Sequence, residues 1–62
     1  MTFDNFVEKI LEVFGENAIV HNNREEGLYE AKFDEWRISM NASGKRIRYY
    51  NVRSKVNFCE EF

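Results

Sequence analysis

The sequence predicts an α+β fold in which one N-terminal helix packs on a four-stranded antiparallel sheet, giving a two-layer α-β-β-β-β meander. Two observations lead to this prediction. Apolar residues repeat with helical spacing over residues 3–14, and they alternate with polar residues over most of the remainder. Helical spacing collects apolar side chains on one stripe and alternation collects them on one sheet face, so the two surfaces can cover each other. We expect residues 1–62 to form one small domain.

The predicted helix begins near Thr2 and ends at Gly15. Its apolar side chains fall at the i, i+3, i+4, i+7 spacing of one helix face: Phe3, Phe6, Val7, Ile10, Leu11 and Phe14. Thr2 or Asp4 can accept a hydrogen bond from a free backbone N–H group at the start of the helix. Gly15 can adopt the left-handed conformation in which helices often end.

Four short segments with strand patterns follow the helix. They cover residues 17–21, 28–33, 36–42 and 45–52, and the polar residues 22–27 predict a loop. The first segment is short and is expected at the edge of the sheet. The other three alternate clearly between apolar and polar positions, so each is expected to bury one face.

Two turns set the register of the three longer strands. Asp34-Glu35 is expected at the centre of the first hairpin and Ser43-Gly44 at the centre of the second. Every facing pair on one face is then apolar or aromatic: Phe33–Trp36, Ala31–Ile38, Tyr29–Met40, Met40–Ile47 and Ile38–Tyr49. A shift of one residue would set apolar positions against charged ones, so this register is favoured.

The same register gathers basic residues on the face that the helix leaves uncovered. The predicted rows across three strands are Lys32–Arg37–Tyr50, Glu30–Ser39–Arg48 and Leu28–Asn41–Arg46. Lys45, Arg53 and Lys55 extend the positive region past the strand ends. The candidate binding residues are Arg37, Arg46, Arg48, Tyr50, Lys32, Lys45 and Arg53. Guanidinium groups bind phosphates or carboxylates through paired hydrogen bonds, and an exposed tyrosine can stack on a base. The alternative is a solvated face, because one face of an antiparallel sheet commonly faces water.

The formal net charge of −2 hides a strong asymmetry along the chain. Residues 1–36 hold nine acidic and three basic residues, a charge of −6, whereas residues 37–56 hold six basic residues and no acidic one. An acidic surface is therefore a second candidate for binding. Glu8, Glu12 and Glu16 repeat every four residues on the outer side of the predicted helix, where a ridge of carboxylates can imitate a phosphate backbone. The alternative is again a solvated face.

The sequence offers little for catalysis or metal binding. It has one histidine, His21, and one cysteine, Cys59, whereas a zinc site needs three or four ligands. The three glycines are isolated and form no phosphate-binding loop. We therefore expect no enzymatic activity, no cofactor and no metal. A single cysteine, no signal peptide and no apolar run of ~20 residues predict a cytoplasmic protein without a membrane partner.

The tail at residues 54–62 carries two conflicting patterns. Val56 and Phe58 alternate as in a strand, whereas Phe58 and Phe62 have the spacing of a helix face. We expect Val56 and Phe58 to complete the core and the last residues to fray. The alternative is that Phe58 and Phe62 anchor on a partner, either a second copy or another protein.

In its short length, low cysteine content, segregated charge and lack of catalytic motifs, the chain resembles small accessory proteins of phages and mobile elements, anti-CRISPR proteins among them. The resemblance covers no motif and implies no residue role. It favours a non-enzymatic binding protein that inhibits or regulates a larger protein by direct contact. The alternatives are single-stranded nucleic-acid binding through Arg37, Arg46, Arg48 and Tyr50, and a structural homo-oligomer such as a homodimer.

Overall fold

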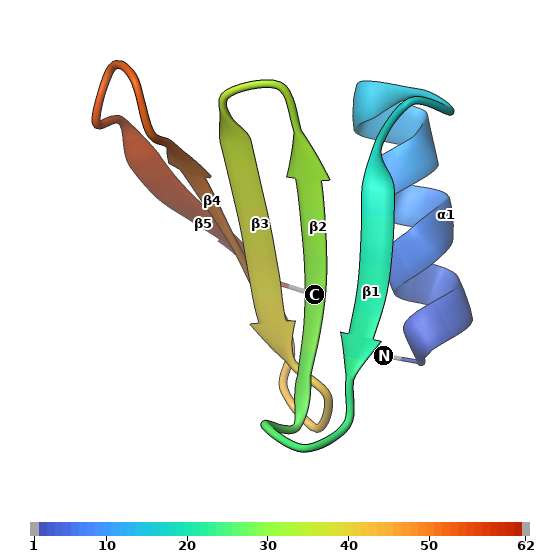
Figure 1. Cartoon of the computed structure of the whole chain (residues 1–62). Coiled ribbons are helices and arrows are strands. Elements are labelled where there is room, and N and C mark those ends of the chain that lie inside the picture. The colour runs from blue at the N-terminus through green and yellow to red at the C-terminus, as the bar shows by residue number, and fades with distance from the viewer. Residues whose placement is uncertain (1, 62) are drawn as a thin grey trace.

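The computed structural model describes residues 2–61, and within them the chain forms one helix and five strands. In chain order these are α1 (Phe3–Phe14), β1 (Ile19–Asn23), β2 (Leu28–Phe33), β3 (Trp36–Asn41), β4 (Arg46–Asn51) and β5 (Asn57–Glu61). Each strand pairs antiparallel with the next, so the sheet order is β1-β2-β3-β4-β5 (Figure 1). The predicted α+β architecture is present, but the prediction of four strands is wrong because the tail adds a fifth.

Helix α1 has the expected signals at both ends. The Thr2 hydroxyl accepts a hydrogen bond of 3.2 Å from the backbone N–H of Asn5. Gly15 follows the last turn with φ at 84° and ψ at −175°, and its N–H bonds the Leu11 carbonyl at 2.9 Å. The positive φ explains the need for glycine, although ψ is extended rather than left-handed helical. Within the described residues no helix is long enough to cross a bilayer, since α1 has 12 residues.

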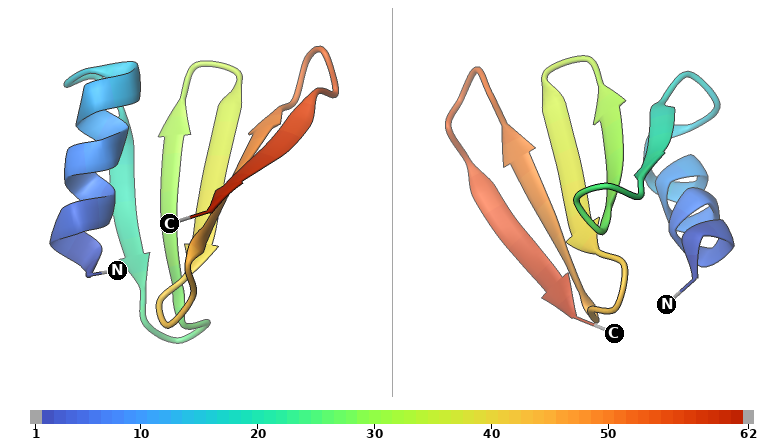
Figure 2. Two further views of the ribbon diagram at one scale, coloured as in Figure 1. Left: turned by 180° about the vertical axis from the view of Figure 1, so that it is seen from behind. Right: turned by 60° about the horizontal axis from the view of Figure 1, so that its bottom comes forward.

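The apolar stripe of α1 packs on one face of the sheet. Phe6 and Ile10 are fully buried. The Phe14 ring lies 5.5 Å from that of Phe33 and 6.3 Å from that of Trp36, so both ends of the first hairpin pack against the helix. Both views in Figure 2 show α1 beside β1, with β4 and β5 twisted away from it. The helix therefore covers the β1–β2 side of this face more fully than the β4–β5 side.

The predicted register is confirmed along the whole of β2–β3, and between β3 and β4 for the pairs from Arg37–Tyr50 to Ser39–Arg48. Phe33 faces Trp36 across the first hairpin, and Ile38 faces Ala31 on one side and Tyr49 on the other. Asp34 adopts a φ of 51° in the turn, a conformation that aspartate tolerates better than most residues. Strand β1 begins at Ile19 and extends to Asn23, so it lies two residues later than the predicted segment 17–21 and includes the start of the predicted loop.

A turn organised by Asn51 explains the strand that the sequence pattern did not reveal. Asn51 is 8% exposed, and its side-chain oxygen accepts hydrogen bonds from the backbone N–H groups of Arg53 (3.1 Å) and Ser54 (3.0 Å). Its own N–H donates to the Val56 carbonyl at 2.9 Å, and Lys55 adopts a φ of 64°. The chain thus reverses over residues 52–56, and β5 pairs with β4 along its length.

The expectation that Val56 and Phe58 complete the core is wrong, because both are 50% exposed. Phe58 is paired with the buried Tyr49 and stacks on it at 4.7 Å, and it meets Trp36 edge-on at 6.0 Å. It remains half-exposed because the β4–β5 hairpin twists away from α1. The prediction that the last residues fray is also wrong for the residues up to Glu61, because β5 extends to that residue. Phe62, the other member of the predicted anchor, lies outside the described residues.

Glu60 joins three elements of the fold. Its carboxylate lies 3.2 Å from the Lys9 ammonium group on α1 and accepts a hydrogen bond of 3.3 Å from the Tyr49 hydroxyl on β4. Burial, together with the charge and hydrogen bond of Glu60, raises the pKa of Tyr49 to about 12. The contact therefore ties β5 to both layers and holds the tyrosine in its neutral form.

Replacing Asn51 with alanine is expected to destabilise the protein by about 1–3 kcal/mol, because two backbone N–H groups lose their acceptor in a partly buried turn. Urea unfolding followed by circular dichroism measures the change in the free energy of unfolding. Asn57→Ala is the matched control, since this side chain is exposed, and its effect should stay below about 0.5 kcal/mol. Equal effects of the two substitutions would contradict the role given to Asn51.

The Tyr49 phenol should make stability depend on pH in the alkaline range. The folded state holds this proton up to about pH 12, whereas a tyrosine in the unfolded chain titrates near 10. The stabilisation that this protonated phenol gives to the folded state is fully present below about pH 10 and is lost as the pH rises towards about 12. Urea unfolding from pH 8 to 11.5 should show a steeper fall for the wild type than for Tyr49→Phe. Tyr50→Phe, on the other face, should behave like the wild type.

Candidate binding surface on the open sheet face

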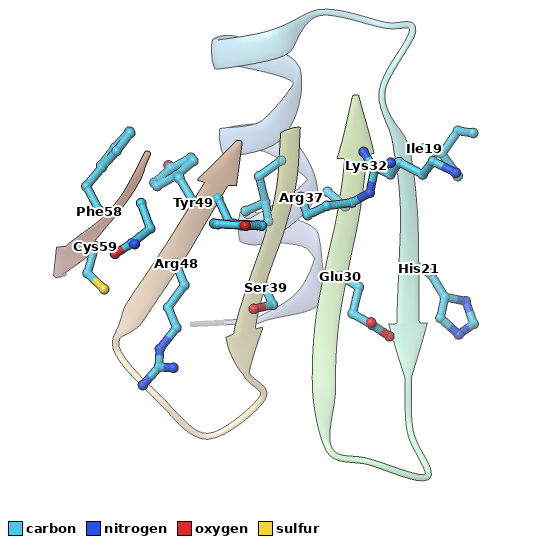
Figure 3. A pocket seen from close by; sticks show the side chains of 14 residues that line it. Ile19, His21, Glu30, Lys32, Arg37, Ser39, Arg48, Tyr49, Phe58 and Cys59 are labelled. Atoms are coloured by element: carbon cyan, nitrogen blue, oxygen red, sulfur yellow. The ribbon is translucent and has the colours of Figure 1, made fainter. Parts of the chain in front are cut away.

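The sheet face turned away from α1, called the open face below, is crossed by two complete rows of side chains. The first row is Ile19–Lys32–Arg37–Tyr50–Asn57 and the second is His21–Glu30–Ser39–Arg48–Cys59. Figure 3 shows His21, Glu30, Ser39 and Arg48 on four adjacent strands, with α1 behind the sheet. The predicted rows Lys32–Arg37–Tyr50 and Glu30–Ser39–Arg48 are therefore confirmed, and each row continues on β1 and β5.

The open face is hollowed between these rows. The hollow has a volume of about 760 Å³, is open to solvent and is lined by residues of all five strands. Ligand pockets usually span ~300–1,000 Å³. The hollow is thus large enough to receive side chains of a partner molecule, and the cations of both rows lie around it.

Arg37 lines the hollow and is held in place by backbone carbonyl groups. Its Nη1 group donates to the carbonyl oxygens of Asp34 at 2.8 Å and Trp36 at 2.9 Å. The Nε and Nη2 groups make no hydrogen bond to any residue between 2 and 61. A guanidinium with five N–H donors can therefore be fixed by two of them and still offer others to a ligand.

Arg48 and Lys32 have no carboxylate partner among the residues that the structure describes. Glu30 is the one acidic residue of the two rows, and its carboxylate accepts a hydrogen bond of 3.0 Å from Asn23. Ser39 separates Glu30 from Arg48 in the second row. Arg37 bonds only backbone carbonyl groups, so the face keeps three cations whose charge no neighbouring side chain cancels.

Three other predicted basic residues are neutralised or lie off the face. Arg46 forms an exposed ion pair with Glu61 at 2.5 Å, and this hydrogen-bonded carboxylate raises the pKa of Arg46 above its ordinary value. Arg53 lies in the β4–β5 turn and pairs with Glu35 at 3.1 Å. Lys45 is exposed just before β4. Of the seven expected residues, Lys32, Arg37, Arg48 and Tyr50 lie in the two rows, Arg46 and Arg53 are neutralised, and Lys45 lies outside the rows.

The candidate acidic surface lies on the other side of the molecule. Glu8 and Glu12 are exposed on α1, whereas Glu16 lies beyond the helix end at Phe14, so the prediction that all three share the helix is wrong. The ion pairs among residues 2–61 are Lys9–Glu60, Arg46–Glu61 and Arg53–Glu35. None of them joins Glu8, Glu12 or Glu16 to the open face, so the two charged surfaces do not cancel each other.

Sequence reasoning missed the outer parts of both rows. Ile19 and His21 on β1, and Asn57 and Cys59 on β5, all line the hollow. The β5 residues were missed because the tail was not expected to pair. The alternation of Val56 and Phe58 could have revealed them, since it continues to put Asn57 and Cys59 on the opposite face.

The arrangement suits binding better than nucleophilic catalysis. His21 and Cys59 stand at opposite ends of their row, ~19 Å apart at a strand spacing of ~4.8 Å. His21 and Ser39 are separated by β2, roughly 10 Å, whereas a base must lie within ~3 Å of its nucleophile. No group of three or more His, Cys, Asp or Glu residues within 2–61 could hold a metal ion.

Comparisons of the chain with known protein families, with curated proteins and with solved structures found no match. The function is therefore inferred from the geometry and charge of the open face.

The Cys59 thiol should react readily in the native protein, because it is exposed on the open face. Ellman's reagent is expected to titrate one thiol per chain without denaturant. The rate should be on the order of that of an unprotected thiol, within a few fold of the rate in 6 M urea. Intact-mass analysis provides the stoichiometry. A native rate slower by two orders of magnitude would contradict this exposure.

Proposed function

We propose that the protein is a non-enzymatic binding protein that inhibits or regulates a larger protein by direct contact through the open face. The main support for the proposal is that the Arg48 side chain is exposed and has no bonding partner among the described residues. This side chain is exposed beside the hollow, on a face that no other element covers, and has no partner within residues 2–61. Lys32 and Arg37 line the same hollow, so three cationic residues surround one site.

The residues on this face favour a protein partner over a single-stranded nucleic acid. Nucleic-acid platforms combine a continuous basic track with several stacking aromatic rings. Here Arg46 and Arg53 are neutralised by Glu61 and Glu35, which shortens the track. Tyr50 is the one aromatic residue of the two rows, and it is 36% exposed. A compact site of this kind fits a short acidic region of a protein.

The resemblance in size and style to accessory proteins of phages and mobile elements belongs to the same proposal. A chain of 62 residues with few catalytic groups can still block a larger machine by covering part of its surface. The open face offers a hollow, fixed hydrogen-bond donors and uncancelled charge for such a contact.

The double variant Lys32→Glu/Arg48→Glu should lose its protein target. Affinity capture from lysate of the native host should recover one protein in stoichiometric amount with the wild type and at least tenfold less with the double variant, a difference of about 1.4 kcal/mol or more. Arg24→Glu, in the exposed loop between β1 and β2, is the matched control and should capture the target normally.

Three results would count against this proposal. They are equal capture by the double variant, capture that disappears after nuclease treatment, and capture of nothing except the protein itself. The second would favour nucleic-acid binding. The third, with a mass by light scattering above that of one chain, would favour the homo-oligomer.

A further inference from the structure

We infer that the open face binds two carboxylates carried on alternate residues of an extended acidic segment of the partner protein. One carboxylate lies over Arg37, between Lys32 and Tyr50, and the other lies at Arg48. This inference rests on the proposed function and specifies the chemistry of its partner.

The first carboxylate position is defined by the row Lys32–Arg37–Tyr50. These residues face one another on adjacent strands, about 4.8 Å apart at the backbone. The bonds from Arg37 to the Asp34 and Trp36 carbonyls hold its guanidinium in place before a ligand arrives. A prealigned donor loses less conformational freedom on binding, and its remaining N–H groups match the two oxygens of a carboxylate.

The second position follows from the place of Arg48 relative to Arg37. Arg48 lies one strand away and one row along, since it faces Ser39 while Arg37 faces Tyr50. The strand spacing and the rise over two residues place the two backbone positions about 8 Å apart. Alternate side chains of an extended peptide point to the same side and are ~6.8 Å apart. A Glu-x-Glu segment therefore matches the backbone spacing of these two arginines. Ser39 lies two residues along β3 from Arg37 and opposite Arg48, so its hydroxyl is beside the same segment.

The acidic groups near the site limit the length of the bound anion. Glu30 lies in the second row, and Glu61 lies at the edge of the sheet beside Arg46. A long polyanion crossing the face would pass these carboxylates and be repelled. A segment with two carboxylates meets Lys32, Arg37 and Arg48 and leaves the acidic positions uncovered.

Binding of defined probes tests this inference. A fluorescein-labelled octapeptide of alternating Glu and Thr should bind at 50 mM salt in a fluorescence anisotropy titration. The same peptide with Gln in place of Glu should bind at least tenfold more weakly. Lys32→Gln and Arg48→Gln should each weaken binding of the acidic peptide about three- to tenfold, since each removes a charge-assisted contact. Arg24→Gln, in the exposed loop between β1 and β2, also removes a cation and should leave the affinity unchanged.

A spectroscopic measurement localises the bound peptide. In ¹⁵N-labelled protein, the Nε–Hε signals of Arg37 and Arg48 should shift during the titration, while that of Arg53, which pairs with Glu35, should stay in place. Shifts confined to other residues would overturn the assignment. Circular dichroism spectra should match between variants, so that a lost affinity reports the site and not unfolding.

The remaining outcomes separate this inference from the proposed function. Equal affinity for the Glu and Gln peptides, or tighter binding of a thymidine octanucleotide than of the acidic peptide, overturns the carboxylate assignment. If no acidic peptide binds but target capture still depends on Arg48, the carboxylate assignment fails and the proposed function stands. If capture is also independent of Arg48, both fail.

Discussion

The pairing register of β2, β3 and β4 is the constraint on which both faces of the sheet depend. Ile38 lies between Ala31 and Tyr49 in the core, and the neighbouring position on β4, Arg48, points outward. A shift of one residue would expose these core side chains and turn arginine towards α1, where a buried, unpaired charge costs several kcal/mol. The packed core and the exposed cations are therefore two consequences of one alternation.

The parts of the fold with a strong periodic pattern could be predicted from sequence, and the fifth strand could not. Phe6 and Ile10 occupy the buried helix positions that their spacing indicates. The turn before β5 contains no glycine or proline and depends instead on Asn51 and on the positive φ of Lys55. Such a turn has no strong local signal, because lysine rarely adopts that conformation.

The same missed strand limited the prediction of the site. The outward direction of Arg37, Arg46 and Arg48 followed from strand alternation and from the hairpin register. The sequence could not show that the charge of Arg46 is cancelled, because its partner, Glu61, lies on the unpredicted strand β5. The structural role of Glu60 was hidden for the same reason. In the sequence, this carboxylate is expected to face solvent. The pairing of β5 with β4 places it beside Lys9 and Tyr49.

The ion pairs of Arg46 and Arg53 shape the surface potential more than the stability. Arg46–Glu61 and Arg53–Glu35 join exposed side chains, and such pairs contribute little to folding. Their effect is to cancel positive charge at the margins of the sheet. On the two rows of the open face, the uncancelled positive charge then lies at Lys32, Arg37 and Arg48, around the hollow. A concentrated charge discriminates between partners by the spacing of their acidic groups, which a continuous basic track does not do.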